Sequence, residues 1–127
     1  MTAPAWIESV VRDFGEAAGL DGLALNDRGA AALSFENGYG LRLEHSFDSL
    51  AVALTVPVRL DAAAAARLLS YARPEARYGF KLRAGYLAKT GCAVLAARLS
   101  DREVTLPALN AVFSALWTIA QEFGGAA

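Results

Sequence analysis

The fold is decided by the stretch from Leu23 to Val58, which reads LALNDRGAAALSFENGYGLRLEHSFDSLAVALTVPV and alternates between apolar and other residues. Alternation with a period of two predicts strands that bury one face. The pair Asn37-Gly38 between two alternating runs is a strong signal for a tight hairpin, and the largely polar stretch from Ser46 to Ser49 predicts a second turn. We therefore expect three antiparallel strands joined by consecutive hairpins, at residues 31–35, 39–45 and 50–58.

One amphipathic helix is predicted before these strands in the sequence, and another after them. In the first helix, which contains Trp6 and Val10, apolar residues recur at helical spacing, and Gly19 marks the end of the pattern. The second is an alanine-rich helix that Asp61 caps. It must stop near Arg73, because the following proline disfavours helical geometry at the residue before it.

Two further strands and a third helix complete the pattern. Apolar and basic residues alternate from Tyr78 to Tyr86, which gives this strand one core face and one basic face. The next strand, Cys92 to Leu99, is largely apolar on both faces, so we expect it to be central or covered on both sides. Thr105 is placed to cap a last helix with a long apolar stripe. The predicted fold class is α+β, an antiparallel five-stranded sheet with three helices in the order α-β-β-β-α-β-β-α.

Length and composition limit the class of protein. A chain of 127 residues is most simply one domain, residues 1–127. Although 55% of the residues are hydrophobic, no apolar stretch approaches the roughly 20 residues of a membrane span. The N-terminus has no basic region followed by an apolar one, and the single Cys92 cannot form an internal disulfide. We therefore expect a cytoplasmic protein.

Residues that could carry chemistry are few. The single histidine, His45, lies on the apolar face of a strand, and no nucleophile motif accompanies it, so we interpret it as structural. One histidine and one cysteine give none of the spacings typical of a metal site. Glu36 and Glu44 are expected on the polar face of a hairpin, where solvated surface charge is the common meaning. The sequence predicts no catalytic residues, no metal and no cofactor.

Charge is unevenly distributed along the chain. The net charge is -1, yet the stretch from Arg59 to Lys89 holds seven basic residues against two acidic ones. Within it, the segment from Arg77 to Arg83 interleaves basic and aromatic residues somewhat as RNA-recognition strands do. Here the alternation puts the aromatic residues on the core face, so we expect no nucleic-acid partner. A generic dimeric α+β protein-interaction module is the nearest alternative function, with a small nucleic-acid-binding protein behind it.

Several local patterns, together with the order of the elements, carry a family resemblance. They are Gly22-Leu23-Ala24-Leu25-Asn26-Asp27-Arg28-Gly29, Leu41-Arg42-Leu43-Glu44, Leu50 to Val56, Leu68-Leu69, Gly79-Phe80-Lys81-Leu82, and the closing stretch Leu106 to Phe123. With these patterns the chain resembles, over nearly its whole length, the class I type III secretion chaperones of the Tir-chaperone (CesT-like) family, which are small bacterial cytoplasmic proteins.

The resemblance implies a function and two sets of contact residues. It implies a homodimer that binds the N-terminal chaperone-binding segment of a secreted effector and keeps it stable and export-competent, without catalytic activity. Such a protein would receive the effector on sheet edges and apolar surfaces. The effector would be bound by exposed parts of the first helix and the first three strands, with the candidates Trp6, Val10, Phe35, Leu41 and Leu43. The dimer contact would involve the second helix and the following strand, with the candidates Leu68, Leu69, Tyr71, Tyr78 and Phe80.

Overall fold

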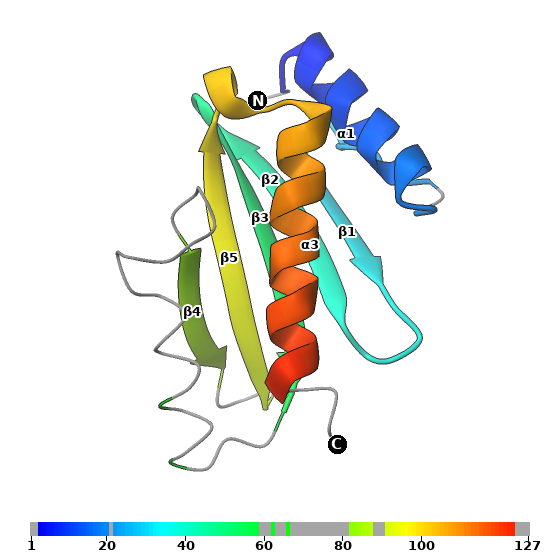
Figure 1. Cartoon of the computed structure of the whole chain (residues 1–127). Helices are drawn as coiled ribbons and strands as arrows, with labels where there is room; N and C mark the ends of the chain where they lie inside the picture. The colour runs from blue at the N-terminus through cyan, green and yellow to red at the C-terminus, as the bar shows by residue number, and fades with distance from the viewer. Residues whose placement is uncertain are drawn as a thin grey trace.

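The computed structural model describes residues 3–20, 22–58, 62, 66, 82–87 and 91–123. In this part of the chain, two helices lie on one face of a five-stranded antiparallel sheet (Figure 1). The strands are β1 (Ala30–Ser34), β2 (Gly40–Ser46), β3 (Ser49–Pro57), β4 (Leu82–Leu87) and β5 (Cys92–Ser100). The helical elements are α1 (Ala5–Ala17), the short 3-10 helix η1 (Asp101–Glu103) and α3 (Leu106–Phe123).

The predicted α+β class and the five-stranded antiparallel sheet are confirmed, but only two of the three expected helices lie in the described residues. The second helix, expected from Asp61 to Arg73, lies outside them except for Ala62 and Ala66, which have helical backbone. The same holds for most of the basic segment: of its seven basic residues, only Arg83 is described.

The sheet has the strand order β1-β2-β3-β5-β4. The first three strands follow one another by hairpins, as predicted, and β5 lies between β3 and β4, which confirms its expected central place. At the β1–β2 turn, the backbone N–H of Phe35 donates to the carbonyl of Tyr39 at 2.8 Å, and Gly38 has a φ of 91°. Glycine adopts this left-handed conformation without steric cost, so the Asn37-Gly38 signal identified the turn correctly.

The core lies between the sheet and the two helices. Alternate residues of the strands point toward the helices and are buried, as the period-two pattern predicted. On the helical side, α1 and α3 each contribute one apolar stripe. The largest fully buried side chains are Phe14, Ile7, Leu41, Leu43, Leu50, Leu54, Leu95, Leu109, Leu116, Ile119, Val11 and Val52.

Helix α1 ends in a glycine motif that fixes its position on the sheet. The N–H of Leu20 donates to the carbonyl of Gly15 at 2.7 Å, and the N–H of Gly19 donates to that of Glu16 at 3.2 Å, while Gly19 has a φ of 73°. This is the Schellman arrangement of a helix C-terminus. Gly15 itself is buried, and a Cβ at this position would lie 2.9 Å from Cβ of Leu23. The glycine therefore allows the following chain to pass close to the helix.

Helix α3 is anchored at both ends. At its start, Oγ1 of Thr105 accepts the N–H of Ala108 at 3.1 Å, which confirms the predicted cap. At its end, the hydroxyl of Tyr39 on the β1–β2 hairpin donates to the carbonyl of Ala120 at 3.4 Å and accepts a hydrogen bond from Nε2 of Gln121 at 3.2 Å. Burial raises the pKa of this tyrosine.

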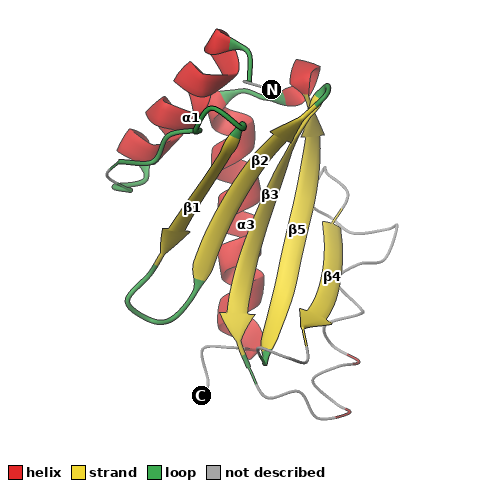
Figure 2. Cartoon of the chain, turned by 180° about the vertical axis from the view of Figure 1, so that it is seen from behind, coloured by secondary structure: helices red, strands yellow, loops and turns green. Residues whose placement is uncertain are grey.

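The other face of the sheet carries no described helix (Figure 2). Its middle consists of small side chains on the two central strands, which are half-buried although no described element covers them. They are Ala51, Ala53, Thr55, Val94 and Ala96. Figure 2 looks directly onto this face, which we call the open face.

Candidate partner-binding surface

Five aromatic residues join α1, α3 and the β1–β2 hairpin. On α3, the ring of Phe113 lies 5.6 Å from that of Phe14 on α1 and 5.7 Å from that of Trp117, one turn further along α3. Trp117 reaches the hairpin through Phe35 at 5.1 Å and Tyr39 at 5.0 Å. We call these five residues the aromatic cluster. Centroid distances of this size are typical of favourable pairs, each adding about 0.5–1.5 kcal/mol beyond the burial of area.

The aromatic cluster is buried on one side and accessible on the other. Phe14 and Tyr39 belong to the core, whereas Phe35, Phe113 and Trp117 are half-buried. The three half-buried rings keep part of their apolar surface in contact with water. Covering such surface is favourable by roughly 25 cal/mol per Å². The aromatic cluster is therefore a surface on which an apolar partner segment would gain binding energy.

The two predicted contacts on α1 lie apart from the aromatic cluster. Trp6, in the first turn of the helix, is 49% exposed, and Val10 is half-buried against the core. Helix α1 begins near the end of the sheet where α3 begins, whereas the β1–β2 hairpin lies at the opposite end (Figure 1). Of the predicted contact residues, the structure therefore brings Phe35 but not Trp6 into the aromatic cluster.

Leu41 and Leu43, the two predicted contacts on β2, are core residues. Their side chains are 1% and 0% exposed, and they point toward the helices from the second strand of the sheet. The resemblance made them candidates, but the alternation along β2 places both on the face that α1 and α3 cover. The candidate surface therefore does not include them.

Sequence reasoning missed Phe113 and Trp117 as surface residues. Both belong to the long apolar stripe of α3, and neither was among the predicted contact residues. The stripe is wider than the sheet can cover: Leu109, Val112 and Leu116 are buried, while Phe113 and Trp117 lie on its flank and are half-buried. Their spacing of four residues along one edge of the stripe was the available signal.

Strand β1 is an open edge of the sheet beside the aromatic cluster. Within the described residues it pairs only with β2, and Phe35 follows directly after its last residue, Ser34. An edge strand presents unpaired backbone N–H and C=O groups on its outer side, and these can pair with an added strand. Backbone pairing sites and apolar surface therefore meet at this corner of the molecule.

Two pairs of titratable side chains in the described residues contact each other. Nε2 of His45 lies 2.9 Å from Oδ1 of Asp101, and this contact joins the end of β2 to η1. Its side chain is 6% exposed, in keeping with the structural role predicted for it. Glu44 lies on the open face, with Arg42 at 3.9 Å. Within the described ranges, no group of three potential ligands is arranged to hold a metal ion.

The residues predicted for the dimer contact lie outside the described residues, so their role stays a prediction. They are Leu68, Leu69, Tyr71, Tyr78 and Phe80. In the part of the chain that the structure describes, no helix is both long and apolar enough to cross a membrane.

The fold, a five-stranded antiparallel sheet with helices on one face, is shared with chaperones of type III secretion systems. Residues 6–124 match the family of the type III secretory system chaperone SycN, and the chain belongs to this family. The protein is thus a chaperone of type III secretion. The class named from the sequence is confirmed, while the narrower CesT-like assignment is not. Among the curated proteins, none matches the chain.

The solved structures with the same fold that we compare with this chain are protein–protein complexes. A chain in the crystal structure of the ExsC-ExsE complex is 25% identical, with a TM-score of 0.75 over 95% of this chain and 92% of that one. A chain of the HopA1-SchA chaperone-effector complex is 17% identical, with a TM-score of 0.70 over 92% and 91%. A chain of the heterodimeric ExoU-SpcU complex, from the type III secretion system of Pseudomonas aeruginosa, is 17% identical. Its TM-score is 0.68 over 94% of this chain and 95% of that one.

Proposed function

We propose that this chaperone binds the N-terminal chaperone-binding segment of a secreted effector and keeps it stable and export-competent. The observation that carries the proposal is the meeting of an open β1 edge with the half-buried rings of Phe35, Phe113 and Trp117. The ExsC-ExsE and HopA1-SchA structures, which have the same fold, are complexes of two different proteins, and the second is a chaperone with its effector. This likeness supports a protein partner for the present chain.

The geometry suits an extended partner segment. Backbone pairing along β1 would provide binding that tolerates varied sequences, while the aromatic cluster would select apolar side chains that flank the added strand. Ordering a flexible segment in this way usually buries on the order of 1,000 to 3,000 Å². Because that area is large for a chain of 127 residues, we infer that the active form is a homodimer, with the predicted contacts of the second helix and fourth strand at its centre.

The proposed chaperone acts in the bacterial cytoplasm and catalyses no reaction. Membership in a chaperone family supports both inferences. The proposed chaperone binds and releases a protein segment. Its binding free energy comes from the burial of surface, and it stabilises no transition state.

Co-expression tests the proposal. The chain is produced together with candidate secreted proteins of the same bacterium, and complexes are isolated by size-exclusion chromatography with light scattering. We expect a stoichiometric complex with at least one of them, containing two copies of the chaperone. A chain that stays monomeric and forms no complex with any secreted protein would contradict the proposal.

Variants at one position then test the surface. Phe35→Ser removes a half-buried ring that stacks on Phe113 at 6.3 Å and contacts Trp117 at 5.1 Å. We expect it to weaken or abolish the complex, whereas the matched control Phe35→Leu, which keeps most of the apolar area, retains it. Both variants must first show native circular dichroism, so that loss of binding is not loss of fold. Equal binding by both would remove the aromatic cluster from the interface.

A further inference from the structure

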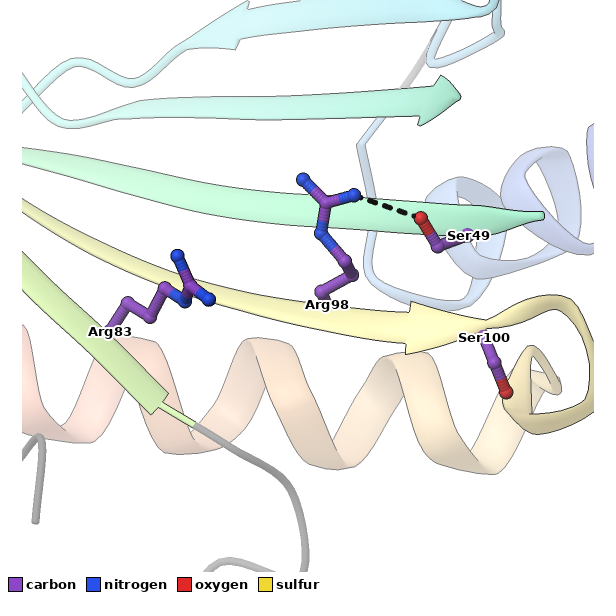
Figure 3. Close-up of a pocket in the computed structure, with 4 residues that line it drawn as sticks. All are labelled: Ser49, Arg83, Arg98 and Ser100. Atoms are coloured by element: carbon purple, nitrogen blue, oxygen red, sulfur yellow. Dashed lines mark hydrogen bonds between the residues drawn. The ribbon is translucent and has the colours of Figure 1, made fainter. Parts of the chain in front are cut away.

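A pocket of about 260 Å³ lies on the open face of the sheet, and two arginines line it (Figure 3). Its lining comes from three strands: Ser49 from β3, Arg83 from β4, and Arg98 and Ser100 from β5. This pocket is separate from the aromatic cluster, which lies on the helix-covered face. The effector-binding surface proposed above does not include it, although Arg83 lies on the fourth strand, which also carries predicted dimer contacts.

Strand register brings these four side chains together. Ser49 is paired directly with Ser100, and Arg83 is paired with Ala96, two residues before Arg98. Paired residues, and residues two apart along a strand, point to the same face. Nη1 of Arg98 donates to Oγ of Ser49 at 3.0 Å, and Ser49 is buried. This hydrogen bond holds one guanidinium in place beside the pocket, as Figure 3 shows.

The two arginines are not neutralised by ion pairs within the described part of the chain. The described charged residues of the open face are Arg42, Glu44, Arg83 and Arg98. Glu44 lies 3.9 Å from Arg42, and no salt bridge joins a described carboxylate to Arg83 or Arg98. The pocket therefore carries two positive charges that attract an anion.

Two carboxylates at the same end of the sheet are held by other groups. Asp101 lies against His45 at 2.9 Å, and Oε1 of Glu103 accepts the backbone N–H of Ser100 at 2.9 Å. The hydrogen bonds to Ser100 lower the pKa of Glu103, so this carboxylate is charged and kept at its cap. Neither acid forms a salt bridge with Arg83 or Arg98.

We propose that this pocket binds a carboxylate of an aspartate or glutamate side chain in the secreted protein that the chaperone carries. Guanidinium groups match the planar carboxylate with paired, charge-assisted hydrogen bonds. The small side chains at the middle of the open face leave room for an extended chain to reach the pocket. That the carboxylate belongs to the secreted protein rests on the proposed function. That the pocket binds an anion rests on the pocket alone.

A titration of the isolated chaperone tests the pocket without any effector. The signals of the arginine Nε–H groups are followed by NMR while an acetylated, amidated Gly-Glu-Gly-Glu-Gly peptide is added, and the matched Gly-Gln-Gly-Gln-Gly peptide and inorganic phosphate are titrated separately. We expect the glutamate peptide to cause saturable shifts of the Arg83 and Arg98 signals that are larger than those caused by the glutamine peptide or by phosphate. The dissociation constant should be on the order of 1 mM and should rise with salt concentration.

Variants locate the binding site. Arg83→Gln and Arg98→Gln should each weaken glutamate-peptide binding by about fivefold, the loss of one charge-assisted contact at an exposed site. Arg42→Gln, on the same face beside Glu44, should leave the affinity unchanged. Three results would contradict the proposal: equal signal shifts with the glutamine peptide, no shift with the glutamate peptide, or an equal loss of affinity in the Arg42→Gln variant. Tighter binding of phosphate than of the glutamate peptide would contradict the claim that the pocket binds a carboxylate of a polypeptide. Each of these results leaves the co-expression test of effector binding untouched.

Discussion

Phe47 provides a sharp test of the backbone geometry, because replacing this residue should make the protein more stable. Phe47 is the first residue of the two-residue turn between β2 and β3, its φ is 58°, and its side chain is 87% exposed. It is the one described non-glycine residue with a positive φ. An L-residue in this conformation costs roughly 1–2 kcal/mol, whereas asparagine tolerates it. Phe47→Asn should therefore remove most of that cost.

The expected gain is about 0.5–1 kcal/mol in the free energy of unfolding. The ring buries only about an eighth of its area, so its loss costs roughly 0.3 kcal/mol of the about 2 kcal/mol for full burial. Phe47→Gly should gain less, because the extra freedom of glycine in the unfolded chain costs about 0.5–1 kcal/mol. The control Phe47→Ala loses the ring but keeps the strained φ, and it should gain nothing.

Urea unfolding at a fixed protein concentration, followed by far-UV circular dichroism, measures these differences. The order of stability should be Asn above Gly, and Gly at or above wild type and Ala. A Phe47→Asn variant that is less stable than wild type, or a Phe47→Ala variant that gains as much, would refute the reasoning from the strained turn.

Three further predictions follow from single contacts. Gly15→Ala should destabilise the protein by about 1 kcal/mol in urea unfolding, because crowding against Leu23 (2.9 Å) outweighs the gain in helix propensity. A neutral or stabilising result would mean that α1 shifts freely. Tyr39→Phe should lower the free energy of unfolding by about 1 kcal/mol, because the Tyr39 hydroxyl makes two hydrogen bonds with the last turn of α3. An unchanged unfolding midpoint would show that these hydrogen bonds do not stabilise the protein. The pKa of Glu103 is lowered by its hydrogen bonds to Ser100, so its contribution to stability is present above its ordinary pKa and is lost as pH falls. The stability difference between wild type and Glu103→Gln should therefore shrink below about pH 4, and a difference independent of pH would contradict the cap.

Much of the fold was predictable because local signals and burial agreed. The hairpin at Asn37-Gly38, the helix end at Gly19 and the cap at Thr105 each depend on a few neighbouring residues, whose backbone preferences act locally. Alternation along β2 and β3 gave the buried face correctly, because the side-chain period of a strand does not depend on its neighbours.

The surfaces were less predictable, because they depend on how elements meet. Periodicity put Leu41 and Phe35 on one face, but only the packing of α1 and α3 buries the first and leaves the second half-exposed. The pocket of Arg83 and Arg98 requires the pairing of β4 with β5 and of β5 with β3, since β3 and β4 are not themselves adjacent in the sheet. No local pattern in the sequence specifies that register.

The central claim is that a secreted partner is held by the β1 edge and the aromatic cluster. Hydrogen–deuterium exchange of the chaperone, alone and in complex with its co-expressed effector, tests this most directly, because strand addition protects the amides of an open edge. The account predicts slower exchange at Ala30–Ser34 and around Phe113 and Trp117 when the effector is bound. Unchanged exchange there, with new protection confined to other strands, would contradict it.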